Sequence, residues 1–239
     1  MTDRFQPLRV TAILRHGIAH ASPWTVALDG LLASQLWAQH KQSQPPGPAA
    51  LDQANPPDMD LPLAKCTADP IWWHWAATCG WPNHPSPNPE IRYWQTRLDH
   101  RHAEHTTAAP LPQIVSDSQG RWKAYWMPLP VTVAHSLTWH AVGDAEAVQR
   151  LLEPITAIGK KRSQGEGRVS SWLVERDDTL DGFTASHLSP TGVLARPTPT
   201  ACLANHPAIV DGGDGYAGIR PPHMHYSRRT DVRLPASCS

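Results

Sequence analysis

Proline is the residue that most restricts how this chain folds, since 25 of the 239 residues are proline. This is about twice the usual ~5% share. The prolines concentrate between residues 42 and 112, in runs such as QPPGP at 44–48 and NHPSPNP at 83–89. A proline fixes φ and lacks an N–H, so no long helix or central strand is expected to cross these runs. We predict one domain, residues 1–239, in which 42–112 is a long insertion rich in proline and tryptophan.

Hydrophobic periodicity predicts regular structure on both sides of this insertion. In chain order, we expect a strand at 8–14, an amphipathic helix at 26–41, strands at 121–127 and 131–142 with a tight link at 128–130, a helix capped by Asp144, and a strand at 169–175. This order, β-α-β-β-α-β, is the ferredoxin-like arrangement that RNA-recognition domains use. Within the insertion we expect a helix at 91–105, and residues 177–239 are expected to form an irregular extension.

Charge and cysteine content exclude several classes of protein. Lys+Arg and Asp+Glu both number 21, so a nucleic-acid site has to be a local basic patch in a neutral molecule. The chain has no run of ~18 apolar residues and no apolar signal core near its first residues, so we expect neither a membrane helix nor export. Four cysteines are too few for a disulfide scaffold of this length, and we expect a cytoplasmic protein with free thiols.

The segment 159–168, GKKRSQGEGR, is the strongest candidate for a binding site. Three glycines allow close approach of the backbone to a partner, and the segment has four positively charged side chains but only one negatively charged side chain, Glu166. Such a loop suits phosphate oxygens, which dominate affinity for nucleic acids. The spacing fits neither a Walker loop nor a dinucleotide fingerprint. The alternative is a flexible surface turn that happens to be basic.

Together with its flanks, 155–169, this segment resembles the glycine-rich loop of the RAMP superfamily of CRISPR proteins. The resemblance is greatest to the Cas-five-like subunits of type IV CRISPR effector complexes. It extends to LDGLLA at 28–33, RWKAY at 121–125, MPLP at 127–130, TWHAVG at 138–143 and RPP at 220–222. Glu166 departs from the pattern, because many relatives carry an aromatic residue there, and a base-stacking contact at this position is therefore not expected.

The resemblance implies a RAMP domain in a prokaryotic ribonucleoprotein. Such subunits grip the 5′ handle of a CRISPR guide RNA, cap the filament of backbone subunits, and adjoin the large subunit that reads the flanking motif of the target DNA. We expect a non-catalytic RNA-binding subunit without a cofactor. The candidate RNA contacts are Gly159, Lys160, Lys161, Arg162, Ser163, Gln164, Gly165, Gly167, Arg168, Arg15, His16, Arg121, Lys123 and Arg220.

Two alternatives remain open on the sequence. Some relatives cut precursor RNA without a metal ion, and such chemistry needs a general base and a general acid. Candidate groups for it are His16, His20, His135, His140, Lys123, Tyr125, Lys160 and Lys161. The second alternative is a zinc-stabilised interaction module, because Cys66, His74, Cys79 and His84 lie within 19 residues of one another. Their order lacks the usual Cys-x₂₋₄-Cys or His-x₃₋₅-His pairs, so we predict free thiols and no metal.

Overall fold

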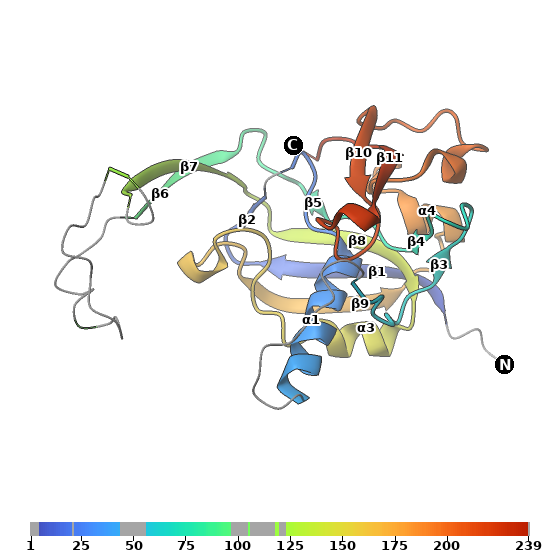
Figure 1. Ribbon diagram of the computed structural model, residues 1–239, viewed down its shortest axis with the longest axis horizontal. Helices are drawn as coiled ribbons and strands as arrows, with labels where there is room; N and C mark the ends of the chain where they lie inside the picture. Colours follow the sequence, from blue (N-terminus) through green and yellow to red (C-terminus); the bar gives the residue numbers. More distant parts are fainter. Residues whose placement is uncertain are drawn as a thin grey trace.

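The computed structural model describes residues 5–20, 22–43, 56–96, 105, 118–119 and 123–238. A four-stranded antiparallel sheet with the order β5-β8-β1-β9 lies at its centre (Figure 1). The strands are β1 (Gln6–Leu14), β5 (Trp81–Asn83), β8 (Ser136–Gly143) and β9 (Val169–Arg176). The order of elements in the sequence predicts an α+β class, and the structure confirms it to the extent that helices occur together with antiparallel sheets.

Helices α1 (Leu28–Ser43) and α3 (Ala145–Leu152) pack side by side against one face of this sheet (Figure 1). Side chains alternate along β1, so that Leu8, Val10, Ala12 and Leu14 are buried while Arg9 and Ile13 are exposed. The buried set shares one core with Leu28, Leu32, Val148, Leu152 and Trp139. As predicted, Asp144 caps α3, and its side chain accepts a hydrogen bond from the amide of Ala147.

The insertion contributes to this core. Leu61, Leu63 and Trp75 are buried in the same cluster as the main sheet, and β5 is one of the sheet's strands. Strands β3 (Lys65–Cys66) and β4 (His74–Trp75) form a short antiparallel pair. Residues 61–83 of the insertion therefore complete the core of the domain.

Strands β6 (Glu90–Thr96) and β7 (Tyr125–Thr132) pair to form an arm that extends away from the main sheet (Figure 1). The predicted helix at 91–105 is wrong over 91–96, which are β6, and of the rest of that range the structure describes only residue 105. The expected link at 128–130 is also wrong, because β7 runs through Pro128 and Pro130. The short strand β2 (Ile18–Ala19) pairs only with Val131 and Thr132, so both prolines lie on an open strand edge that tolerates a missing N–H. The expected long strand 131–142 is divided between β7 and β8.

The C-terminal segment is more regular than predicted. It contains α4 (Gly182–His187), the 3₁₀ turns η3 (Thr200–Leu203) and η4 (Tyr226–Arg228), and the hairpin of β10 (Asp214–Gly218) and β11 (Arg229–Arg233). It also packs on α1, where a Cβ at Gly30 would meet the His223 ring at 3.3 Å, so this glycine faces the C-terminal segment. Among the described residues, no helix has the length and apolar character needed to cross a membrane.

Candidate nucleic-acid interface

The basic loop 159–168 connects α3 to β9 and is an ordered structure. Its backbone has positive φ at Gly159, Lys161, Gly165 and Gly167, and a 3₁₀ turn η2 covers Arg162–Gln164. Two of the glycines are required by close contacts inside the protein. A Cβ on Gly167 would lie 1.8 Å from the Ile158 carbonyl oxygen, and one on Gly159 would lie 2.5 Å from the Ala19 oxygen. The glycines therefore fix the shape of the loop.

Two hydrogen bonds attach the loop to the segment that follows β1. The amide of Arg15 donates to the Arg168 carbonyl at 3.0 Å, and the amide of Lys160 donates to the Ala19 carbonyl at 2.8 Å. The side chains of Arg15 and His16 are exposed beside these contacts. The structure thus places two further predicted RNA contacts next to the loop.

The other side of the loop is held by the arm. Arg92 of β6 donates two hydrogen bonds to the Glu166 carboxylate, at 2.8 and 2.9 Å, and Glu166 is buried. Hydrogen bonds to Glu90 and Glu166 raise the pKa of Arg92 above its usual value, so Arg92 remains a cation in this contact. Glu166 therefore connects the loop to the arm, a role that its position in the sequence did not indicate.

Lys161 is part of the same contact. Its ammonium nitrogen lies 3.0 Å from the centroid of the Trp94 ring, which is a cation–π arrangement. Gln164 and Glu166 line one side of a pocket of about 310 Å³, with Arg92, Tyr93, Trp94 and Gln95 on the other side. A polar and aromatic hollow therefore separates the loop from the arm.

The remaining cations of the loop point to solvent. Lys160, Arg162 and Arg168 are exposed, as is Arg15, and none of the four forms an ion pair within the described part of the chain. Four uncompensated positive charges on a fixed backbone form a binding surface for anions. Ser163 and Gln164, on the 3₁₀ turn, add exposed polar groups.

Aromatic side chains lie on both faces of the arm, and the sequence analysis missed them. Trp94 and Tyr125 share the face of Arg92, which meets the loop, whereas Tyr93 and Trp126 lie on the opposite face. Tyr93 and Trp126 pack edge to face with centroids 5.8 Å apart, and Trp94 stacks on Tyr125 at 6.3 Å. Tyr93 and Trp126 are 62% and 72% exposed, which leaves large aromatic faces open to a ligand. The alternation Ile91, Tyr93, Gln95 against Arg92, Trp94, Thr96 was the period-two signal of a strand.

Two other predicted contacts belong to other parts of the fold, since Lys123 precedes β7 and Arg220 lies in the C-terminal segment. Lys123 is exposed, and its nitrogen lies 5.8 Å from the Tyr125 ring, whereas Arg121 lies outside the described residues. Arg220 is only 8% exposed; it donates to the Trp73 carbonyl at 2.9 Å, and its guanidinium lies 4.5 Å from the Trp73 ring centroid. These contacts give Arg220 a structural role in joining the C-terminal segment to the insertion.

The structure gives the candidate catalytic histidines different environments. His140 is buried, and its Nδ1 is hydrogen-bonded to the Leu188 carbonyl. His20 is hydrogen-bonded through its two ring nitrogens to Thr132 and to the Ser22 carbonyl. Only His16 and His135 of this group are exposed. The structure also separates the four cysteines and histidines considered for zinc, since Cys66 and His74 come together but Cys79 pairs with Ala27 and His84 is exposed on a turn.

Comparison with known proteins agrees with the resemblance seen in the sequence. The model of the family described as "CRISPR type IV associated protein Csf3" matches residues 6–188, which include the main sheet, the arm and the basic loop. The chain belongs to the Csf3 family. It is therefore a subunit associated with type IV CRISPR systems, as the sequence predicted. A search of the curated proteins found no match.

The range of the match also shows which parts of the chain resemble the Csf3 family model. It ends at residue 188, directly after α4, so the segment with η3, the β10–β11 hairpin and Arg220 lies beyond the matched range. The basic loop, Arg15 and the aromatic arm all lie within it.

Proposed function

We propose that this Csf3-family protein binds the guide RNA of a type IV CRISPR complex without cutting it. The supporting observation is the basic loop 159–168, whose exposed cations stand on a fixed backbone between Arg15 and the aromatic arm. The guide RNA is the nucleic acid that a CRISPR-associated subunit of this kind would meet.

The chemistry of this surface suits single-stranded RNA. Lys160, Arg162, Arg168 and Arg15 supply charges for phosphate oxygens, which position the strand without reading its sequence. The rings of Trp94 and Tyr125, on the face of the arm that meets the loop, supply stacking surfaces, and a stacked base is worth ~1–3 kcal/mol. A backbone track beside a stacking platform is a common way to hold an unpaired strand.

The arrangement of the main sheet supports a ferredoxin-like RAMP core. The order β1-α1-β5-β8-α3-β9 along the chain corresponds to β-α-β-β-α-β if β5 is counted as the second strand. The sheet order β9-β1-β8-β5 then places the first and third strands at the centre. In this proposal the second strand comes from the insertion instead of residues 121–127, and the RNA-binding loop lies between the second helix and the last strand.

The expected partners follow from this role. We propose that the chain grips the 5′ handle of the guide RNA and caps the filament of backbone subunits next to the large subunit, near the flanking motif of the target DNA. In a prokaryotic cell this assembly would lie in the cytoplasm. We place contacts with the RNA on the aromatic side chains of the arm.

A filter-binding titration with labelled repeat RNA tests the proposal. Changing Lys160, Lys161 and Arg162 together to alanine should weaken binding and reduce the slope of log K against log salt by about 2, at roughly 0.7 per lost phosphate contact. The matched control replaces Arg150, Arg176 and Arg229, which removes the same charge away from the loop. Equal affinity of the two variants would contradict an RNA site at the loop.

The same RNA incubated in EDTA distinguishes binding from cleavage. We expect the labelled repeat to remain intact, since His140 and His20 are engaged in internal hydrogen bonds. A cut that persists in EDTA and disappears in His16→Ala or His135→Ala would instead assign the metal-independent endoribonuclease activity.

A further inference from the structure

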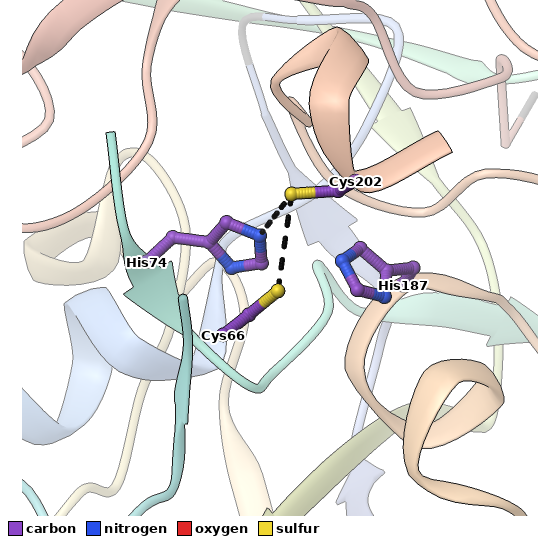
Figure 2. Close-up of side chains that lie close together, drawn as sticks. All are labelled: Cys66, His74, His187 and Cys202. Atoms are coloured by element: carbon purple, nitrogen blue, oxygen red, sulfur yellow. Dashed lines mark hydrogen bonds between the residues drawn. The ribbon is translucent and has the colours of Figure 1, made fainter. Parts of the chain in front are cut away.

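Two cysteines and two histidines that are far apart in the sequence meet in the interior of the protein. Cys66 belongs to β3, His74 to β4, His187 ends α4, and Cys202 lies on η3 (Figure 2). The four potential ligand atoms all lie within 4.8 Å of one another. His74, His187 and Cys202 are buried, and Cys66 is partly buried.

Two distances within the cluster match those of a tetrahedral zinc site. Two thiolates bound at ~2.3 Å to one ion lie about 3.8 Å apart, and a thiolate and an imidazole nitrogen at ~2.0–2.1 Å lie about 3.6 Å apart. The sulfur atoms of Cys66 and Cys202 are 3.8 Å apart, and Cys202 Sγ lies 3.6 Å from Nε2 of His74 (Figure 2).

Both imidazole rings are oriented as zinc ligands are. The Nδ1 atom of His74 is hydrogen-bonded to the Trp75 carbonyl at 2.9 Å, and Nδ1 of His187 to the Phe183 carbonyl at 3.0 Å. A backbone carbonyl accepts only from an N–H, so each Nδ1 carries the proton and each Nε2 presents a lone pair to the cluster. Nε2 of His187 is buried and has no hydrogen-bond partner among the described residues, which is costly unless something else binds it.

We propose that Cys66, His74, His187 and Cys202 bind one zinc ion. The set is Cys₂His₂, with four protein ligands and therefore no open position for a substrate, which is the pattern of a structural site. Two thiolates also neutralise the charge of the ion, so the buried site carries no net charge.

The site would join two parts of the fold that are distant in the chain. Cys66 and His74 belong to the insertion, whereas His187 and Cys202 belong to the C-terminal segment, 128 residues from His74 in the case of Cys202. Zinc would thus fasten α4 and η3 to the β3–β4 pair. Its predicted effect is on the stability of the C-terminal segment, and it is independent of whether the basic loop binds RNA.

Two other structures that use these side chains have to be distinguished from a zinc site: a disulfide and an iron–sulfur centre. A disulfide between Cys66 and Cys202 would need the sulfur atoms to approach from 3.8 Å to ~2.05 Å. An iron–sulfur centre also uses cysteine, with or without histidine, but it absorbs visible light. The experiment has to separate both from zinc.

The test measures metal content and free thiols in the full-length chain, produced in zinc-supplemented medium and purified without chelating resin. We expect about one zinc per chain, little iron, and four reactive thiols after denaturation without reductant. Cys202→Ala and His187→Ala should lose at least ~90% of the zinc, as expected when one of four ligands is removed. Cys79→Ala is the matched control, because Cys79 is a buried cysteine outside the cluster and should leave the zinc in place.

A second measurement keeps the proposal testable if these variants fail to fold. The wild-type chain is loaded with cobalt(II), whose visible spectrum reports tetrahedral geometry and whose near-ultraviolet band reports thiolate ligands. Alternatively, a mercurial reagent is titrated against the zinc-loaded chain while a chromogenic chelator records the zinc that is released. The proposal predicts cobalt–thiolate absorption and complete release of zinc after two thiols react.

Several results would overturn the inference. These are a folded wild-type chain that takes up neither zinc nor cobalt, two missing thiols that show a disulfide, stoichiometric iron with visible absorption, or zinc retained in Cys202→Ala. Removal of zinc from the wild type by EDTA with no fall in melting temperature would overturn the structural role.

Discussion

Gly167, in the basic loop, lies very close to the backbone of Ile158, and this contact leads to a specific prediction. Replacing it with alanine would place a Cβ 1.8 Å from the Ile158 carbonyl oxygen. A relaxed C···O contact is about 3.3 Å, so the two backbone segments would have to separate by about 1.5 Å. The hydrogen bond from the Ile158 amide to the Gly167 carbonyl, 2.9 Å long, would then be lost.

The expected loss of stability has two parts. A left-handed conformation costs a residue with a Cβ ~1–2 kcal/mol, and Gly167 has φ of 64°. Breaking a buried backbone hydrogen bond adds ~1–3 kcal/mol. We expect Gly167→Ala to lower the free energy of unfolding by about 2–5 kcal/mol in total, which corresponds to ~2–4 °C of melting temperature for each kcal/mol.

Gly165→Ala is the matched control. Gly165 also has positive φ, at 97°, but a Cβ there would meet nothing within 4 Å. It should therefore cost only the conformational part, ~1–2 kcal/mol. The entropy that an alanine removes from the unfolded chain is similar for both variants and cancels in the comparison.

Urea unfolding followed by circular dichroism measures both variants against the wild type. The reasoning is refuted if the two variants lose the same stability, or if Gly167→Ala is tolerated within ~0.5 kcal/mol, the usual range for an unconstrained surface position.

Three further predictions concern other parts of the fold. Asp29→Asn should lower the free energy of unfolding by about 3–5 kcal/mol, because Asp29 is buried beside Arg196 and His223, whereas the exposed Asp178→Asn should change little. Burial alone would raise the pKa of Asp29, but His223 and Arg196 lower it below its ordinary 3.8. The contribution of Asp29 is therefore complete above pH 3.8 and is lost as the pH falls through the lower folded value, so acid titration of stability should bring wild type and Asp29→Asn together. Asp181→Ala should lower the unfolding free energy by ~1 kcal/mol in urea denaturation, since its side chain accepts the Thr184 amide at the start of α4; an unchanged midpoint would contradict the cap. The isolated chain should aggregate through the exposed side chains of Tyr93 and Trp126 on the arm. Changing both residues to serine should reduce the light scattering of the isolated chain, and unchanged scattering would show that another surface causes the aggregation.

Short-range patterns in the sequence predicted the elements that form the centre of the fold. The alternation of Leu8, Val10, Ala12 and Leu14 is both the signal of β1 and the reason for its burial. Asp144 marked the first turn of α3 because its carboxylate meets an unpaired helix amide. The glycines and cations of 159–168 marked a loop whose position between α3 and β9 was also predicted. In each case the residues that carry the signal also make the local contact.

The insertion and β7 resisted prediction because their structure depends on residues that are distant in the sequence. Pro128 and Pro130 argued for a link, but they are tolerated because β2 pairs only with the end of β7. Cys66 and His74 were considered with Cys79 and His84, their neighbours in the sequence, whereas the fold brings them to His187 and Cys202. No spacing rule covers ligands separated by 128 residues.

The arm and Glu166 together explain how an aromatic side chain reaches this loop. At Glu166, where the resemblance to RAMP proteins implies an aromatic residue in many relatives, this chain has a carboxylate that is buried against Arg92 of β6. That ion pair draws the arm toward the loop, so that the Trp94 ring lies 3.0 Å from the Lys161 nitrogen. An aromatic side chain thus reaches the loop from the arm instead of from the loop's own sequence. If bases stack at this site, the stacking surface is therefore expected on β6 and β7, and Glu166 acts by positioning them.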